Sequence, residues 1–103
     1  MVEVKWTAQA LRDIDTIAKY IAEDSEYYAG IQTKRFFAAA EILETFPKTG
    51  RIVPEINVQN IRELIVGNYR IIYAIINLEK VDILTVHHSA KLLRKSTLRK
   101  KKN

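Results

Sequence analysis

Residues 61–88 read IRELIVGNYRIIYAIINLEKVDILTVHH, and they carry the strongest secondary-structure pattern in the chain. It holds three runs rich in isoleucine, valine, leucine and tyrosine, which are residues typical of β-strands. The runs are Ile61–Val66, Tyr69–Ile76 and Val81–His88. They are separated by Gly67-Asn68 and by residues 77–80, and connections this short are typical of hairpins. The stretch therefore predicts an antiparallel meander of three strands.

The segment before the meander predicts a pair of helices. From residue 8 to about residue 23, apolar residues recur at helical spacing and charged residues occupy the other side. Residues 24–26 (Asp-Ser-Glu) offer a turn and a new helix cap, and a second helical pattern runs from about residue 28 to Phe46. Pro47 ends it, because proline disfavours a helical residue before it. A short connection between two helices gives an antiparallel hairpin.

Two remaining segments complete the fold class. Residues 2–6 alternate apolar and polar side chains and predict a short strand, whereas residues 48–60 show no sustained period and predict a loop of functional length. The order strand, helix, helix, strand, strand, strand predicts a two-layer α+β sandwich, with the helical hairpin packed on one face of an antiparallel sheet. The other face would then be open to a partner or a substrate.

Composition limits the class of protein. With 103 residues, 48% of them hydrophobic, the chain can form one domain, which we assign to residues 1–90, followed by a basic tail at 91–103. The absence of cysteine excludes disulfides, zinc thiolate sites and cysteine nucleophiles. No apolar run approaches the ~20 residues that a membrane span needs, and the first residues lack a signal-peptide core. We therefore expect a cytoplasmic protein without membrane contacts.

The net charge of +5 is unevenly distributed. Residues 1–90 carry ten of the 17 basic residues and all 12 acidic ones, a balance of −2, and residues 91–103 carry the other seven basic residues. The basic character thus belongs to the tail. Such a run is either a solvated terminus or part of a site for a polyanion or an acidic partner.

Three stretches carry a joint pattern: FPKTGRIVPE (46–55), IRELIVGNYRIIYAI (61–75) and VDILTVHHSAKLL (81–93). Together with the order of elements, this pattern resembles the RelE/ParE superfamily of type II toxin–antitoxin toxins, which includes plasmid stabilisation proteins. The resemblance implies a growth-arresting toxin, silenced by an acidic antitoxin that lays a helix or strand over the open sheet face. It implies contact with operator DNA only through the antitoxin, and no metal or cofactor.

The resemblance also implies a candidate catalytic set for cleavage of RNA without metal. Glu55 would be the base for the ribose 2′-hydroxyl, Arg70 would hold the phosphate, and His88 would be the acid for the departing oxygen. The residues themselves leave alternatives open. Arg70 lies in an apolar row of its strand and could instead form an ion pair with Glu63 or Asp82. Periodicity does not choose between the adjacent histidines, and only the resemblance favours His88 over His87.

Other residues could extend a phosphate-binding surface beside Arg70. The candidates are Arg51, Arg62, Lys91 and Arg94, and their alternative is scattered surface charge. Tyr69 and Tyr73 could stack on bases or pack in the core.

Relatives with this fold either cleave mRNA on the ribosome or poison DNA gyrase, and the sequence favours RNA cleavage slightly. The segment Ile56–Asn60 lacks the basic residues of the most lysine-rich RNases of the superfamily, which keeps gyrase inhibition open. An inactive toxin that only binds its antitoxin is the third hypothesis.

Overall fold

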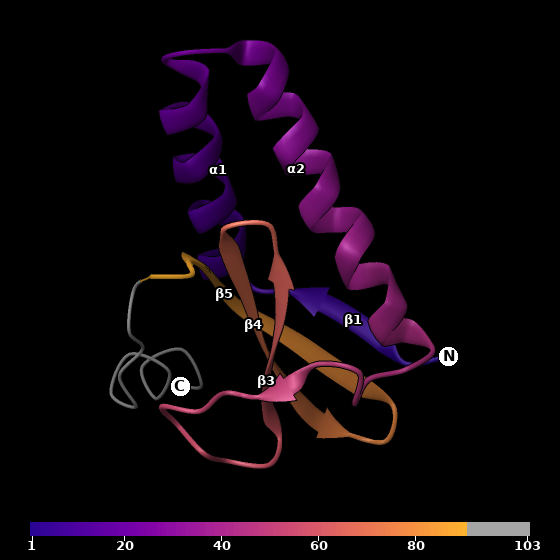
Figure 1. Cartoon of the computed structure of the whole chain (residues 1–103). Helices are drawn as coiled ribbons and strands as arrows, with labels where there is room; N and C mark the ends of the chain where they lie inside the picture. The colour runs from indigo at the N-terminus through magenta and orange to yellow at the C-terminus, as the bar shows by residue number, and fades with distance from the viewer. Residues whose placement is uncertain (91–103) are drawn as a thin grey trace.

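The computed structural model describes residues 1–90, and the meander forms its centre (Figure 1). Strands β3 (Ile61–Val66), β4 (Tyr69–Asn77) and β5 (Lys80–His88) pair antiparallel, as the sequence predicts. The turn between β3 and β4 contains only Gly67 and Asn68, and Gly67 takes a φ of 59°. Glycine suits this place because an L side chain rarely adopts a positive φ.

Two further strands complete a mixed sheet among the described residues. Strand β1 (Glu3–Trp6) runs parallel to β5, and the short β2 (Arg51–Ile52) runs antiparallel to β3. The strand order is β1-β5-β4-β3-β2. The α+β fold class is therefore confirmed, while β2 lies in the segment that the sequence predicts to be a loop.

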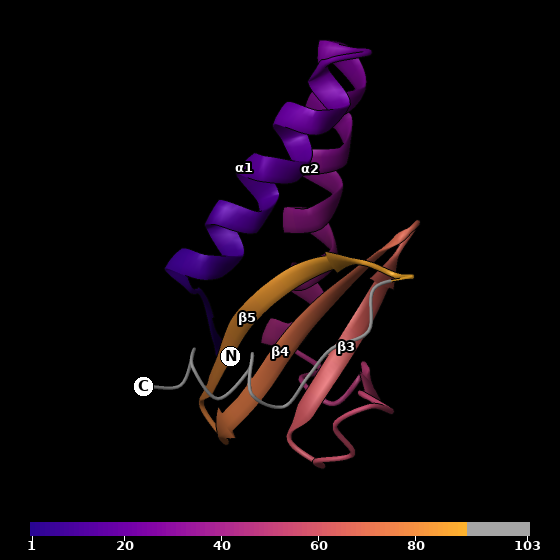
Figure 2. The same ribbon diagram turned by 90° about the vertical axis from the view of Figure 1, so that its left-hand side faces the viewer.

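Helices α1 (Ala8–Ala22) and α2 (Glu26–Ala40) form the expected hairpin, and Figures 1 and 2 show its tip projecting beyond the sheet. The side chains of Thr7 and Ser25 cap the two helices. Thr7 accepts a hydrogen bond from the backbone N–H of Ala10, and Ser25 accepts one from that of Tyr28. The second helix begins two residues earlier than predicted, because Ser25 is the cap. It gives way at Ala40 to the 3₁₀ turn η1 (Glu41–Glu44), which buries Leu43.

The helix face of the sheet carries one hydrophobic cluster. Phe36 of α2 and Ile14 of α1 pack there with Ile71, Tyr73 and Ile83 of the meander. Burial of these side chains, each worth about 1.5–3 kcal/mol, holds the hairpin on the sheet.

The opposite face is only partly open, unlike the sequence-based expectation. The loop between β2 and β3 folds back over it, so that Val53 and Ile56 form a second cluster with Ile61, Ile72 and Leu84. The physical reason is that β4 is apolar on both faces and therefore needs cover on both. This loop face is where the polar candidates of the sequence gather.

Strand β5 extends beyond its neighbour β1, and α1 lies beside the part of the β5 edge that β1 leaves unpaired. The pairing with β1 stops at Ile83. Past that point the carboxylate of Asp13 in α1 accepts hydrogen bonds from the backbone N–H of Val86 (3.1 Å) and from the hydroxyl of Thr85. A helix side chain thus supplies the partner that a missing strand would have supplied. Among residues 1–90, no helix is long and apolar enough to cross a membrane.

Candidate functional site

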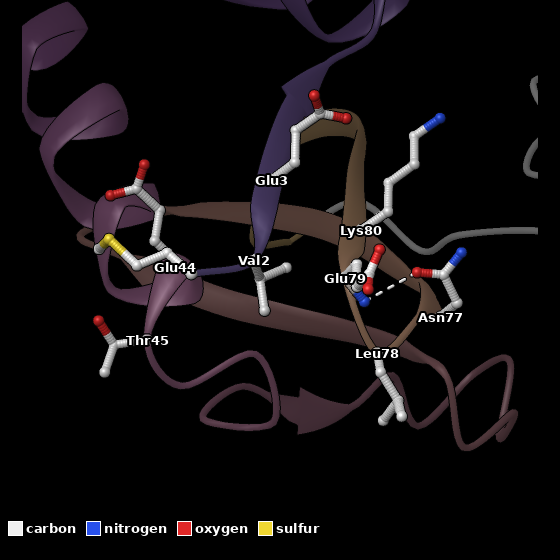
Figure 3. Close-up of a pocket in the computed structure, with 9 residues that line it drawn as sticks. Val2, Glu3, Glu44, Thr45, Asn77, Leu78, Glu79 and Lys80 are labelled. Carbon is white, nitrogen blue, oxygen red and sulfur yellow. Dashed lines mark hydrogen bonds between the residues drawn. The ribbon is translucent and has the colours of Figure 1, made fainter.

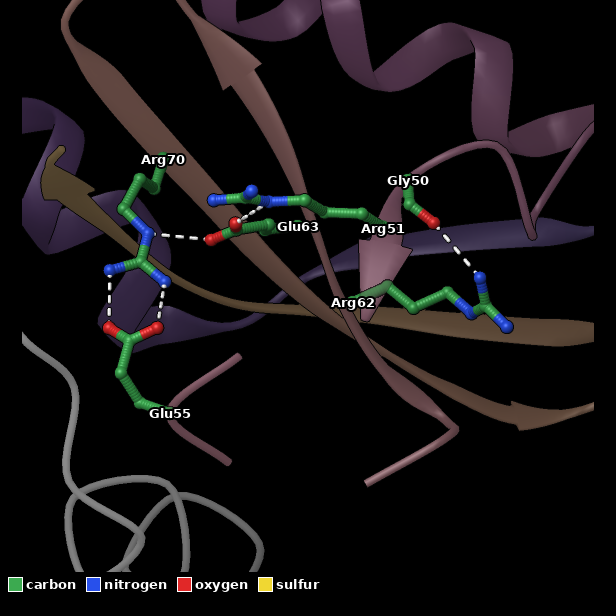
Figure 4. Close-up of polar contacts among 6 residues, drawn as sticks. All are labelled: Gly50, Arg51, Glu55, Arg62, Glu63 and Arg70. Carbon is green, nitrogen blue, oxygen red and sulfur yellow. Dashed lines mark hydrogen bonds and ion pairs between the residues drawn. The ribbon is translucent and has the colours of Figure 1, made fainter. Parts of the chain in front are cut away.

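Arg70 lies near the start of β4 and points to the loop face, with 4% of its surface exposed. Its Nε donates to Oε1 of Glu63 at 2.6 Å. Its two terminal nitrogens donate to the two carboxylate oxygens of Glu55, at 2.6 and 2.8 Å (Figure 4). This two-pronged contact is the geometry in which a guanidinium binds a carboxylate most strongly.

Glu63 extends these contacts to a second arginine. It lies on β3, is 1% exposed, and receives Nε of Arg70 on one oxygen and Nε of Arg51 on the other. Arg51 lies opposite Glu63 on β2, with most of its own side chain in solvent. The four residues Glu55, Arg70, Glu63 and Arg51 form a chain of alternating charge, which we call the Arg70 network. Its formal charges cancel, which is the condition for burying ions at tolerable cost.

The network fixes the charge of its central arginine. The hydrogen bonds with Glu55 are the largest influence and raise the pKa of Arg70 above its ordinary value, while burial opposes that shift. Of the two ion-pair partners that the sequence leaves open, Glu63 is the one that contacts Arg70. Asp82 lies near the start of β5, where it forms an ion pair with Lys80 at 4.0 Å.

The structure places the two histidines on opposite faces of β5. His87 is the cross-strand partner of Arg70, and its Nε2 lies 3.1 Å from the hydroxyl of Thr85. His88 is exposed and pairs with Tyr69, whose ring packs edge-on against Phe36 on the helix face. Glu55 and Arg70 are therefore brought together as the resemblance implies, but His88 points away from them.

The remaining candidates have separate roles or lie outside the described residues. Arg62 donates to the backbone carbonyl of Gln59 (3.1 Å), at the end of the loop between β2 and β3. It also donates to the carbonyl of Gly50 (3.0 Å), just before β2, and so ties the two segments together (Figure 4). Lys91 and Arg94 belong to the tail, outside residues 1–90.

Tyr73 is fully buried and packs in the core, where it anchors the segment between η1 and β2. Its hydroxyl donates to the carbonyl of Pro47 (2.7 Å) and accepts from the N–H of Gly50 (3.0 Å). A Cβ on Gly50 would lie 2.5 Å from the carbonyl oxygen of Glu63, which is closer than atoms can approach. Burial raises the pKa of Tyr73. The sequence offers no signal for this contact beyond the presence of a glycine.

A large pocket of the described chain lies elsewhere (Figure 3). It has a volume of about 820 Å³ and is formed by residues 1–3, the end of η1 and the turn between β4 and β5. Glu3, Glu44 and Glu79 line it. Arg70 is near the start of β4 and Asn77 ends it, so seven residues at about 3.3 Å each separate the pocket from the Arg70 network. The pocket and the network are therefore distinct features.

Comparison with known families identifies the chain. Residues 4–93 match the family described as the ParE toxin of the type II toxin–antitoxin system parDE. The chain belongs to this family of toxins. The match covers all the strands and helices described above, apart from Glu3 at the start of β1.

Relatives agree with this assignment. The ParE-family chain is 32% identical over 92 residues to the toxin RelE2 of Caulobacter vibrioides, covering 89% of this chain and all of that one. It is 33% identical over 86 residues to the protein Y4kP of Sinorhizobium fredii, covering 84% and 86% of the two chains. A solved chain of the chromosomal ParDE system from P. aeruginosa has the same fold, with a TM-score of 0.70 at 20% identity over 85% of this chain and 96% of that one.

Family membership confirms two of the expectations from sequence. The chain is the toxin of a type II toxin–antitoxin system, and its partner is an antitoxin.

Proposed function

We propose that this ParE-family toxin arrests growth by binding and poisoning DNA gyrase, without cleaving RNA. The observation that carries the proposal is the Arg70 network. Nε and both terminal nitrogens of Arg70 each donate to a carboxylate, and the side chain is buried between Glu55 and Glu63. A phosphate would have to displace Glu55 to reach the guanidinium.

The position of His88 supports the same conclusion. A general acid must come within hydrogen-bond reach of the atom that takes its proton, about 2.6–3.2 Å or one water away. His88 lies on the face of β5 opposite to Arg70, so a scissile phosphate held at Arg70 would be on the far side of the sheet from the acid. Of the two targets that the superfamily resemblance implies, gyrase makes no demand for an acid–base set.

Two assays on the purified toxin test this proposal together. In a supercoiling assay, we expect the toxin to inhibit gyrase in proportion to its concentration, and an excess of antitoxin to restore activity. In a parallel translation assay with mapped mRNA ends, we expect the same ends with and without toxin. The proposal would be overturned if the toxin produced new mRNA ends within codons, only when ribosomes are present, and left gyrase activity unchanged.

That outcome would restore the acid–base hypothesis for Glu55, Arg70 and His88, with Arg51 and Arg62 as further phosphate contacts. In that case Glu55 would have to leave Arg70 when RNA binds. Loss of RNA cleavage in a folded Glu55→Gln variant would then assign the base.

A further inference from the structure

A cavity on the loop face of the sheet lies apart from the Arg70 network. Its volume is about 440 Å³, within the range of about 300–1,000 Å³ that ligand pockets span. Its walls are mostly apolar, and its lining includes one carboxylate. The main lining residues are Val58, Ile61, Ala74, Ile76, Asp82 and Leu84, and we call this space the Asp82 cavity.

The register of the strands explains why the space exists. Ala74 of β4 lies directly opposite Asp82 of β5, so two larger apolar side chains do not meet there. The loop covers Ala74 and Leu84 only as far as its rim at Val58. Ile76 and Val58 remain 48% and 42% exposed.

Asp82 has an unmet need in this position. Its Oδ1 is closed to solvent and accepts no hydrogen bond among the described residues. Within residues 1–90, Asp82 forms an ion pair with Nζ of Lys80 at 4.0 Å, which is beyond hydrogen-bond range. A carboxylate oxygen that has lost water without gaining a donor is costly to the folded chain, and a donor brought by a partner would remove that cost.

We propose that the Asp82 cavity receives an arginine or lysine side chain of the antitoxin. The methylene stem of such a residue would pack against Ile61, Ile76 and Leu84, and its cationic head would donate to Asp82. Long cationic side chains pair an apolar stem with a charged head in this way. Neither a purely apolar side chain nor an acidic one would meet both features of the cavity.

The antitoxin is the partner that fits this surface. The exposed Ile76 and Val58 at the rim are apolar area that a stably bound chain would cover. In a toxin–antitoxin system the antitoxin is the partner that stays bound while the toxin is silent. The inference rests on family membership and not on the proposed target, so a failure of gyrase inhibition would leave it standing.

The test compares the affinity of the antitoxin for three toxin variants. For this test, the antitoxin would be identified as the product of an adjacent gene whose co-expression rescues growth. We expect Asp82→Asn to weaken the complex by roughly 10- to 100-fold, the loss of one charge-assisted hydrogen bond. Glu79→Gln removes the same charge from the neighbouring turn, and Lys80→Ala removes the competing cation. Both should leave the affinity within about threefold, because only Asp82 would contact the antitoxin side chain.

The stability of the free toxin separates binding from a structural role. Asp82→Asn should leave the denaturation midpoint unchanged or raise it, because the variant no longer buries a carboxylate oxygen that accepts no hydrogen bond. A folded Asp82→Asn variant that binds the antitoxin as tightly as wild type would overturn the inference. So would a variant whose weaker binding is matched by an equal loss of its own stability.

A small probe tests the chemistry without the antitoxin. In a backbone amide NMR titration, n-butylguanidinium should produce saturable shifts at Ile61, Ala74 and Leu84, and the neutral n-butylurea should not. The guanidinium response should weaken at least tenfold in Asp82→Asn. Equal responses to the two probes would show an apolar cavity without a cation site and would overturn the assignment.

Discussion

The sequence predicts that Arg70 needs an ion-pair partner, but it does not identify both of the partners that Arg70 has. An arginine in an apolar strand needs a partner, and the sequence offers Glu63 as one candidate. Glu63 lies on β3, two residues before Ile65, which is the cross-strand partner of Arg70. The contact with Glu55 is not visible, because it depends on the path of a loop that includes Asn57 at a φ of 53°. Local patterns do not encode such a path.

Because the Arg70 network is buried, breaking it should cost stability. We expect Arg70→Ala to lower the free energy of unfolding by about 3–5 kcal/mol, since Glu63 would stay buried with less compensation. Urea denaturation of the purified variant measures this. Lys19→Ala is the matched control, because it breaks the exposed pair with Asp15 and should cost under about 1 kcal/mol. Equal losses in both variants would mean that the network contributes nothing special.

The hydroxyl of Tyr73 should make stability depend on alkaline pH. At neutral pH, Tyr73→Phe should cost about 1–3 kcal/mol, because the hydrogen bonds to Gly50 and Pro47 are lost. The folded-state pKa of Tyr73 is raised above 10.0, so its contribution is complete below that pH and is lost as the pH rises through the folded value. Wild type should therefore lose more stability than the variant above about pH 10. Denaturation curves at neutral and alkaline pH measure this. Equal losses of stability in wild type and in Tyr73→Phe would contradict a contribution from the ionisation of Tyr73.

His88 provides the residue-scale test of mechanism. We expect a folded His88→Gln variant to arrest growth as wild type does, because His88 lies on the opposite face from Arg70 and has no acid role in gyrase poisoning. Growth after induction, with antitoxin binding as the check on folding, measures this. A folded variant that no longer arrests growth would contradict the proposal and favour RNA cleavage.

At the scale of elements, the long periodic segments could be predicted and the short ones could not. Strands β3, β4 and β5 are each long enough for their β-type composition to be recognised, and short turns separate them. Strand β2 has two residues and exists only because β3 pairs with it. The faces of β5 were also beyond prediction, because a register shift places Leu84 and Val86, which share a parity in the sequence, in different clusters. A bulge of this kind breaks any alternation count.

The cap that α1 places on β5 gives an element-scale prediction. Asp13→Ala would leave the N–H of Val86 and the hydroxyl of Thr85 without their acceptor, and we expect a loss of about 1–3 kcal/mol. Amide exchange at Val86 should accelerate by more than that at Ile71 in the centre of β4. Asp15→Ala, on the exposed side of the same helix, serves as control and should change stability by under about 0.5 kcal/mol. Similar exchange at both amides would contradict the capping role.

For the whole molecule, the separation of charge predicts how salt affects the antitoxin. Without residues 91–103 the formal net charge falls from +5 to −2. If the antitoxin is acidic, as the superfamily resemblance implies, a toxin cut after Ala90 should associate with it more slowly and with less dependence on ionic strength. Stopped-flow association at low and high salt measures both. An unchanged salt dependence would place the electrostatic attraction on residues 1–90 instead.

The pairing of β1 with β5 also delays completion of the sheet during synthesis of the chain. Glu3 is made well before Lys80, which is its neighbour in the sheet. At about 5–20 residues per second, β1 waits roughly 4–15 s for its partner strand. During that interval neither the edge that Asp13 covers nor the partner of Arg70 on β5 exists. The nascent chain therefore lacks the finished sheet of the toxin until β5 has been made.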